Sequence, residues 1–269
     1  MGEGNAGDSA HLFRWQAGVE PLTRRAPDWI TKTPIAHRGL HDATAGIIEN
    51  TASAFERAAE RGYAIELDVL PSRDGEAIVF HDDDLQRLCG RPERIADLTT
   101  ADLAKIPIKG TRDPIPTLGQ VFDQVNGRVP ILVELKSLGE NPGRLEARVA
   151  ELLHAYDGPL AVQSFNPHTL AWFAENMPTV PRGQLSMRYT REDAPALDIA
   201  QRALLANMLC NHLSRPDFIA YDVAAIEDPA PRIARLMGLP LITWTVKSAE
   251  AWQRAKAHAD NLIFEGFAA

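Results

Sequence analysis

The chain has few cysteines, no excess of basic residues and no long hydrophobic run, and each absence argues against a class of protein. Its 269 residues include two cysteines, Cys89 and Cys210, and neither stands in a Cys-x-x-Cys or Cys/His spacing. The sequence therefore predicts neither a disulfide framework nor a structural zinc site. Lys and Arg number 28 against 36 Asp and Glu, and the net charge of -8 argues against nucleic acid as a partner.

Signals for membrane insertion and export are also missing. No segment approaches the run of about 18 apolar residues that a membrane-spanning helix needs. The first residues, MGEGNAGDSAHLFRWQ, lack the basic start and apolar run of a signal peptide. We therefore expect a soluble, cytoplasmic protein without stable membrane insertion. A small anionic substrate remains compatible with the net charge.

The sequence does contain enough apolar residues for one large core. Hydrophobic residues make up 45% of the chain, and α/β barrels commonly use about 200 to 250 residues as a single domain. We predict one domain over residues 32–269, preceded by an N-terminal arm over 1–31. About the first ten residues are small and polar and are expected to be disordered, whereas Leu12, Phe13 and Trp15 are expected to pack against the body.

Short β-rich runs alternate with helical patterns, and this alternation predicts βα units on a parallel sheet. The predicted strands lie at 34–39, 63–72, 76–82, 129–136, 160–165, 182–186, 218–223, 240–246 and 261–267. Helical patterns lie at 53–62, 142–156, 167–176, 194–211, 228–237 and 248–258. One long interval breaks the alternation, and we interpret it as an insertion over about 83–116 followed by a helix over about 117–126.

Strand parity brings three carboxylates together, because side chains two residues apart share a face. Glu66 and Asp68 share a face in YAIELDVL, and Glu134 and Lys136 share one in PILVELKS. Two carboxylates about 4 Å apart repel by roughly 4 kcal/mol at an effective dielectric near 20, so we expect a cation between them. If both strands face one interior, the acids form an all-oxygen set that favours Mg²⁺ or Ca²⁺ over zinc. A salt-bridge cluster built on Lys136 is the structural alternative.

Two histidines follow apolar runs at predicted strand ends. His37 alternates with Ile35, and His81 aligns with Val79. In parallel α/β barrels the carboxyl ends of the strands hold the chemistry, and imidazole titrates close to neutral pH. The two histidines are therefore candidates for a general acid/base pair. A hydrogen-bonded structural histidine is the alternative at each position.

The stretch PIAHRGLHD also offers a possible metal pair, His37 and His41. An H-x3-H pair binds metal on a helix face, but Gly39 and the preceding strand disfavour a helix here. Arg38 is the stronger candidate for chemistry, because a guanidinium matches phosphate geometry in a bidentate manner. It would face away from His37 by strict parity, so the chain must bend at Gly39, and a surface ion pair is the alternative. We expect His41 to be a loop residue near the rim.

Eight segments of the chain carry a family resemblance. They are AHRG, ENTASAF, IELDV, DGEAIVFHDDDLQRL, IPTLGQVF, VELK, QSFN and TWTV. In order and spacing they resemble the glycerophosphodiester phosphodiesterases over about residues 34–265. The resemblance implies a TIM-type (β/α)8 barrel with a small insertion after the second strand. It also implies a divalent cation, Mg²⁺ or Ca²⁺ with Mn²⁺ possible, and hydrolysis of glycerophosphodiesters to an alcohol and sn-glycerol 3-phosphate.

The resemblance also implies roles for the residues at matching positions. The implied metal ligands are Glu66, Asp68 and Glu134, and the implied acid/base pair is His37 and His81, with His37 favoured as base. Arg38 and Lys136 are expected to bind phosphate, Trp244 to form a pocket wall, and Glu49 and Asn50 to lie near the site. Asn50 could equally be a helix cap.

The sequence departs from the family pattern in two places. Ile48 stands where the family commonly has proline, and the last strand, NLIFEGF, lacks the aspartate and further helix that often follow. The eighth helix position is therefore open, and we expect the arm over 11–31 to fill it.

Alternative functions remain at this stage. The nearest are a lysophospholipase D-like or a cyclising phosphodiesterase on lipid-derived diesters; a non-catalytic phosphate-binding barrel and a metabolite isomerase are less favoured. Few exposed-looking aromatics occur in the insertion, which favours small, soluble diesters. The sequence gives neither the leaving alcohol nor the oligomeric state.

Overall fold

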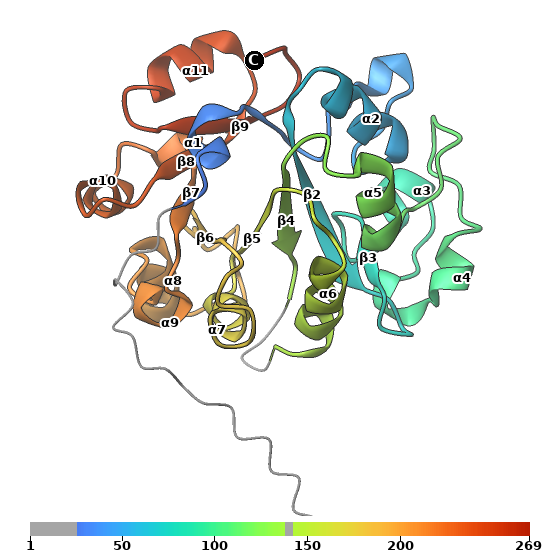
Figure 1. Ribbon diagram of the computed structural model, residues 1–269. Coiled ribbons are helices and arrows are strands. Elements are labelled where there is room, and N and C mark those ends of the chain that lie inside the picture. The colour runs from blue at the N-terminus through green and yellow to red at the C-terminus, as the bar shows by residue number, and fades with distance from the viewer. Residues whose placement is uncertain (1–25, 138–141) are drawn as a thin grey trace, which may run out of the picture.

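The computed structural model describes residues 26–137 and 142–269 and shows a closed parallel barrel with one extra strand. The sheet order is β1-β9-β8-β7-β6-β5-β4-β2-β3, and β1 also pairs with β2, which closes the ring (Figure 1). The strands are β1 Ile35–Ala36, β2 Ala64–Pro71, β3 Ala77–Val79, β4 Ile131–Leu135, β5 Leu160–Ser164, β6 Arg182–Ser186, β7 Phe218–Asp222, β8 Leu241–Val246 and β9 Asn261–Phe264. The predicted barrel is therefore confirmed, and each predicted strand run contains a strand.

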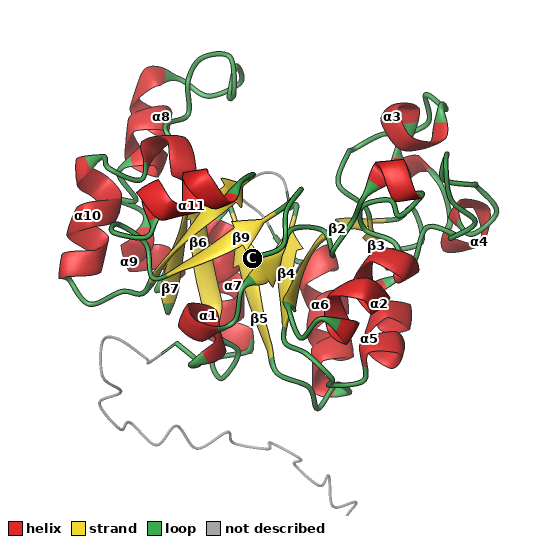
Figure 2. Ribbon diagram, turned by 90° about the horizontal axis from the view of Figure 1, so that it is seen from above, coloured by secondary structure: helices red, strands yellow, loops and turns green. Residues whose placement is uncertain are grey.

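Helices surround the sheet in the view from above (Figure 2). They are α1 Trp29–Lys32, α2 Ala52–Glu60, α3 Gln86–Cys89, α4 Thr100–Leu103, α5 Leu118–Val125, α6 Arg144–His154, α7 Pro167–Asn176, α8 Ile199–Ala206, α9 Asn211–Ser214, α10 Pro229–Leu236 and α11 Ala249–Ala255. Short 3-10 turns lie at η1 Ala43–Ala45, η2 Ile95–Asp97 and η3 Val223–Ala225. The helix predicted over 194–211 is wrong in extent, because Met208 adopts a left-handed backbone (φ 53°) between α8 and α9.

The interior of the barrel is apolar at one end and polar at the other. Alternate residues of the strands, such as Ala64 and Leu132, join an apolar cluster inside the ring, while their neighbours Ile65 and Val133 pack outward toward the helices. Parallel pairing aligns Asp68 of β2 with Glu134 of β4. Every second residue of a strand faces the barrel interior. The inward-facing residues are apolar near the start of the strands and polar near their carboxyl ends.

The insertion follows the second barrel strand, as predicted. β3 folds back antiparallel on β2 and is not part of the ring. The segment from 83 to 116 contains α3, η2 and α4 and lies on the opposite side of the barrel from α8 and α10 (Figure 2). It has an apolar cluster of its own, which includes Phe80, Leu85, Ile95, Leu103, Ile106 and Ile108. This cluster holds the insertion against the side of β2 and β3.

Most of the predicted N-terminal arm, residues 1–25, lies outside the described residues. The part that is described, with α1, packs at the end of the barrel. Ile30 is fully buried in the interior cluster, and Asn261 Nδ2 donates to the carbonyl oxygens of Ile30 (2.8 Å) and Thr33 (2.7 Å). This segment therefore covers the end of the barrel at which β9 begins, and it does not occupy the eighth helix position.

The outer face of β9 is covered by the residues that follow it. Phe267 packs edge-on against Phe264, with ring centroids 5.5 Å apart. Tyr63 packs on Phe264 from the other side at 4.9 Å, and its hydroxyl donates to the carbonyl oxygen of Ala269 (2.8 Å). In the described part of the chain no helix follows β9, so aromatic contacts take the place of a helix there.

Candidate active site

Three buried carboxylates meet at the carboxyl end of the barrel. One oxygen from each of Glu66, Asp68 and Glu134 lies within 4.8 Å of the others. Glu66 and Asp68 are each 1% exposed and Glu134 is 8% exposed. Burial, together with the neighbouring charges of Asp68 and Glu134, raises the pKa of Glu66 well above its usual value. The structure thus brings together the three acids that strand parity predicted. Their burial and mutual repulsion disfavour the ionised form of Glu66.

Two cationic side chains partly neutralise this cluster. Lys136 Nζ lies 2.9 Å from a Glu134 oxygen and 3.1 Å from an Asp68 oxygen. Arg38 Nε lies 3.4 Å from the other Asp68 oxygen. Burial opposes ionisation of Asp68, but Lys136 and Arg38 lower its pKa to about 2. The salt-bridge alternative is therefore partly realised. In the described part of the chain, however, the Glu66 carboxylate accepts one hydrogen bond, from Arg38 N–H at 2.9 Å.

Arg38 reaches the pocket because the chain turns sharply after β1. Arg38 (φ 53°) and Gly39 (φ 80°) both adopt left-handed backbone conformations. A Cβ on Gly39 would lie 2.9 Å from the Cβ and carbonyl carbon of Ala54, so only glycine fits this turn. The bend expected at Gly39 thus begins one residue earlier, and it lets Arg38 and His37 line the same cavity.

Glu49 and Asn50 both contact the site. Asn50 Nδ2 donates to Asp68 (2.9 Å), and Glu49 accepts from Arg38 Nη1 (2.7 Å). Asn50 is 1% exposed and has a left-handed backbone (φ 55°). The cap of α2 is Thr51, whose hydroxyl accepts from Ala54 N–H, so the alternative of Asn50 as a helix cap is wrong.

His37 is held by a residue that the sequence analysis did not single out. Its Nδ1 lies 2.6 Å from Glu265 Oε2. Burial lowers the pKa of His37, while the hydrogen bond to Glu265 raises it. Parity could have found this acid, because Glu265 stands two residues after Ile263, which faces the barrel interior.

His81 has a similar carboxylate partner but a different origin. It follows β3, which is not a barrel strand, and reaches the site because β3 doubles back so that Phe80 N–H donates to Asp68 O (3.1 Å). Its Nδ1 lies 2.7 Å from Asp82 Oδ1. Burial lowers the pKa of His81, and Asp68 raises it. His81 therefore lies at the end of a strand, as predicted, but that strand is the antiparallel β3 and not a parallel strand of the barrel.

Arg87 of the insertion ties the His81 side of the site to Glu49. Its Nε donates to Asp82 Oδ2 (2.6 Å), and its Nη1 and Nη2 donate to the two oxygens of Glu49 (2.9 and 2.7 Å). Because Glu49 also accepts from Arg38, a continuous chain of ion pairs runs from the insertion to the pocket. Sequence reasoning could not have found Arg87, since no periodicity places a loop helix against a strand end.

His37, Arg38, Glu66, His81, Glu134, Lys136 and Trp244 all line one cavity of about 90 Å³. Gln163 and Phe165, which were not predicted, line it as well. Phe165 packs edge-on against Trp244 at a centroid distance of 5.5 Å, so the two form an apolar wall opposite the charged residues.

His41 lies beside this site without forming a metal pair. Its Nε2 is 3.7 Å from Glu265 Oε2, the same oxygen that holds His37. Among the described residues, the side chains that could jointly hold a metal ion are Glu66, Asp68 and Glu134. The H-x3-H reading is therefore unsupported.

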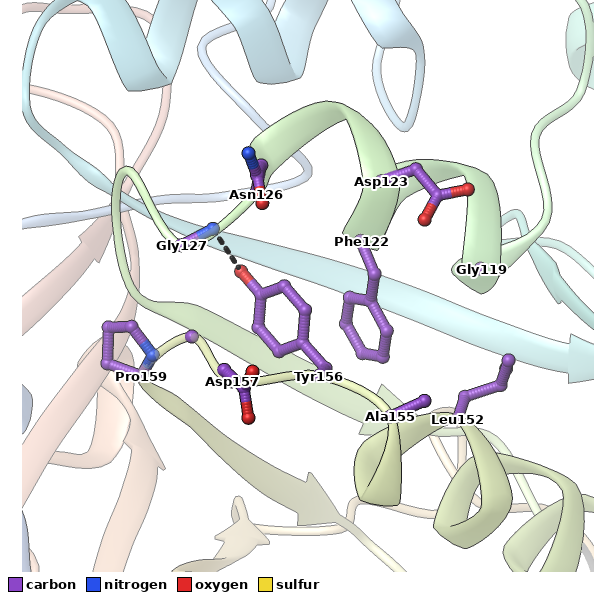
Figure 3. A pocket seen from close by; sticks show the side chains of 11 residues that line it. Gly119, Phe122, Asp123, Asn126, Gly127, Leu152, Ala155, Tyr156, Asp157 and Pro159 are labelled. Carbon is purple, nitrogen blue, oxygen red and sulfur yellow. Dashed lines mark hydrogen bonds between the residues drawn. The ribbon is translucent and has the colours of Figure 1, made fainter.

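A larger cavity, of about 540 Å³, lies between α5 and α6 and the loops that lead into β4 and β5 (Figure 3). Phe122 and Tyr156 stack there at 4.3 Å, and the Tyr156 hydroxyl accepts from Gly127 N–H (3.1 Å). Its lining contains Asp123 and Asp157 but none of the histidines or clustered carboxylates. Size alone does not locate chemistry, and we place the candidate site in the smaller cavity.

A family model described as the glycerophosphoryl diester phosphodiesterase family matches residues 37–264. The chain belongs to this family. A glycerophosphodiester phosphodiesterase of Bacillus subtilis (strain 168) is 28% identical over 239 residues, which cover 80% of this chain and 76% of that protein. The crystal structure of a glycerophosphodiester phosphodiesterase from Thermotoga maritima superposes with a TM-score of 0.66 and 26% identity, covering 86% of this chain and 94% of that one.

A phosphodiesterase of Oleispira antarctica, solved in complex with the product sn-glycerol-3-phosphate, has a TM-score of 0.72 at 21% identity. The superposed region covers 87% of this chain and 92% of the Oleispira antarctica protein. At this level of identity the likeness shows the fold alone. The matches span 63%, 76% and 59% of the lengths of three curated relatives.

The family and its named members indicate a phosphoric diester hydrolase on a TIM barrel, acting on glycerophosphodiesters. The acidic cluster is compatible with the metal dependence of such a hydrolase. Within 26–137 and 142–269, no helix has both the length and the hydrophobicity to cross a membrane.

Proposed function

We propose that this pocket hydrolyses glycerophosphodiesters to an alcohol and sn-glycerol 3-phosphate, with a divalent cation held by Glu66, Asp68 and Glu134. The observation that carries the proposal is the imbalance of charge in the cavity. Three buried carboxylates converge within 4.8 Å, and among residues 26–137 and 142–269 two cationic side chains, Arg38 and Lys136, reach them.

The carboxylates fit a hard divalent cation. Oxygen ligands lie about 2.0 to 2.6 Å from Mg²⁺ or Ca²⁺, so two ligands of one ion are at most roughly 4 to 5 Å apart. One oxygen from each carboxylate lies within 4.8 Å of the others, which agrees with that limit. The absence of sulfur and nitrogen ligands favours Mg²⁺, Ca²⁺ or Mn²⁺ over zinc. When bound, such an ion supplies Lewis-acid polarisation of a phosphoryl oxygen and lowers the pKa of an adjacent hydroxyl. It would also relieve the repulsion that raises the pKa of Glu66.

The two histidines are suited to move protons on opposite sides of the phosphate. Burial lowers the pKa of His37, which favours the neutral base. Burial also lowers the pKa of His81, but Asp68 and the hydrogen bond to Asp82 raise it and favour the imidazolium. Neutral His37 takes the proton of the attacking hydroxyl, either water or the glycerol 2-hydroxyl, on Nε2, and His81 as the imidazolium gives its Nε2 proton to the leaving alcohol. Each transfer contributes on the order of 10² to 10⁴ in rate.

Arg38 and Lys136 bind the phosphate and offset the negative charge that develops on it. Ion pairs with Asp68 and with Glu134 or Glu49 hold both side chains in the cavity. Their charge is therefore positioned before substrate arrives, which lowers the cost of reorganisation during the reaction.

The other side of the cavity suits the glycerol moiety. Trp244 and Phe165 offer an apolar wall for its carbon chain. Gln163 is 1% exposed, and its Oε1 has no hydrogen-bond partner among the described residues, so it can accept from a glycerol hydroxyl. The small volume, about 90 Å³, favours small, soluble diesters. A cytoplasmic location is a further proposal, supported by the two cysteines, which are both free.

The test is release of sn-glycerol 3-phosphate from glycerophosphocholine. The protein is freed of metal with EDTA, then assayed with Mg²⁺, Mn²⁺ or Ca²⁺, and lysophosphatidylcholine is assayed in parallel. We expect no product without metal, restoration by at least one ion, and faster turnover of the soluble diester. Equal rates with and without EDTA would contradict the metal assignment, and faster turnover of the lysophospholipid would overturn the preference for soluble diesters.

A further inference from the structure

Glu265 lies where the ring closes, in the loop directly after β9. Its Oε2 is 2.6 Å from His37 Nδ1, and its Oε1 is 2.8 Å from Lys247 Nζ. The side chain is 20% exposed, so a partly buried carboxylate holds the ring of a candidate proton-transfer residue. This contact joins the last strand of the barrel to the first, because β1 pairs with β9.

We propose that Glu265 is the positioning residue of His37: it accepts the Nδ1–H hydrogen bond, fixes the ring so that an unprotonated Nε2 serves the cavity, and stabilises the imidazolium that forms there. The inference rests on the proposed function, in which His37 accepts a proton. In that step the O–H bond of the nucleophile breaks, its proton joins Nε2, and Nδ1–H stays on the ring. Glu265 remains a carboxylate throughout.

The surroundings of Glu265 keep it ionised in this role. The hydrogen bond from His37, the ion pair with Lys247 and the nearby His41 hold the pKa of Glu265 far below its usual range. A proton therefore stays on the imidazole and does not pass to the carboxylate, as orientation and charge stabilisation require. Lys247 is 71% exposed and stabilises Glu265 from the solvent side, through the other carboxylate oxygen.

Other charged groups around His37 do not replace this contact. Arg38, beside it in sequence, lowers its pKa, and Asp68 raises it through space. Asp68 is already paired with Lys136 and Arg38 and receives a hydrogen bond from Asn50. Other charged or titratable residues around His37 are Glu66, His81, Glu134, Lys136, His41 and Lys247. Among the described residues, Glu265 is the one hydrogen-bonded to His37 Nδ1.

Kinetics of Glu265→Gln test the proposal, since glutamine keeps the size and removes the charge. We expect kcat to fall roughly 10- to 100-fold, as for other partners that orient an active-site group, with KM changed less than threefold. The limb of the pH profile that reports His37 should move to lower pH, because a contact that raises its pKa is weakened. Glu250→Gln, the same change at an exposed position of α11, is the matched control and should stay within twofold of wild type.

A second measurement does not depend on activity. Imidazole ¹⁵N signals of His37 in the full-length protein should show the tautomer with a proton on Nδ1, and Glu265→Ala should lose that preference while its melting curve remains cooperative. A wild-type His37 with the proton on Nε2, or a Glu265→Gln variant with unchanged kcat and pH profile, would overturn the proposal. If wild type hydrolyses no glycerophosphodiester but the tautomer is as expected, the proposed function fails and the positioning contact stands.

Discussion

Asp68 and Glu134 lie opposite each other in the register of β2 and β4, and the ammonium group of Lys136 bridges them at 3.1 and 2.9 Å. The positive charge of Lys136 partly offsets the negative charges of Asp68 and Glu134. The pKa of Glu66 remains raised by its burial and by the charges of these two neighbours. The barrel thus stores repulsion at one carboxylate when no ion is bound. A folded-state pKa above the unfolded one means that stability falls as pH rises through it, so Glu66 destabilises the metal-free protein near neutral pH.

Glu66→Gln should therefore stabilise the metal-free protein while abolishing metal binding. Removing roughly 1 kcal/mol of repulsion raises the melting temperature by about 2 to 4 °C in a protein of this size. Saturating Mg²⁺ or Ca²⁺ should raise the melting temperature of wild type, because the ion binds the folded state, and should leave the variant unchanged. Scanning calorimetry of both proteins, with EDTA and with each ion, measures the two effects. An apo variant less stable than wild type would contradict the account.

Acid should weaken the metal-free protein through Asp68. The Asp68 pKa of about 2 lies below the value of about 3.9 expected in an unfolded chain. Its contribution is complete above the unfolded pKa and is lost as pH falls from about 4 toward 2, on the order of 2 kcal/mol in total. Urea unfolding across this range should show a shallower pH slope for Asp68→Asn. Asp97→Asn, on the exposed surface of η2, is the control.

Alanine substitutions at two glycines distinguish the cost of a left-handed backbone from the cost of a steric clash. Gly39 (φ 80°) and Gly62 (φ 72°) are both left-handed, but only Gly39 would place a Cβ against Ala54, whereas Gly62 has open space. Alanine at either position should cost about 1 kcal/mol for the backbone, and at Gly39 a further ~1 to 3 kcal/mol for overpacking. Urea midpoints measure this difference. Gly39→Ala should also reduce turnover by displacing Arg38; equal stability loss and normal activity in both variants would argue against the tight turn.

The insertion should influence turnover through Arg87. Its removal leaves Asp82 and Glu49 without their shared partner, so we expect Arg87→Ala to lower kcat roughly 10-fold, as for other residues that orient an active-site group. Arg87→Lys should lose less activity than Arg87→Ala but should remain below wild type, because an ammonium group cannot make the bidentate contacts of a guanidinium. Arg91→Ala, which breaks the exposed pair with Glu93 in the same insertion, is the matched control. Similar kcat values for the Arg87 and Arg91 variants would show that the network has no role.

Much of the fold and part of the site could be predicted from the sequence. The alternation of short β-rich runs with helical patterns placed each strand of the described residues. Strand parity predicted that Glu66, Asp68 and Glu134 converge, because barrel strands keep their register. Glu265 follows from the same parity through Ile263, although the sequence analysis did not name it.

Other features could not be found in this way. Arg38 and Asn50 depend on left-handed backbone conformations that no periodicity reveals. Asp82 and Arg87 depend on how the insertion folds back over β3. These contacts arise between segments whose relative placement is set by tertiary packing, so propensity and spacing do not determine them.

We expect two histidines, His37 and His81, to move protons in a metal-assisted hydrolysis. The most direct test is the rate of sn-glycerol 3-phosphate release from glycerophosphocholine at saturating cation for wild type, His37→Ala and His81→Ala, each shown to be folded by its melting curve. We expect turnover by wild type and a loss of about 10² to 10⁴ in kcat for each variant. Near-normal release by either folded variant, or no release by wild type with any of the three ions, would contradict the claim.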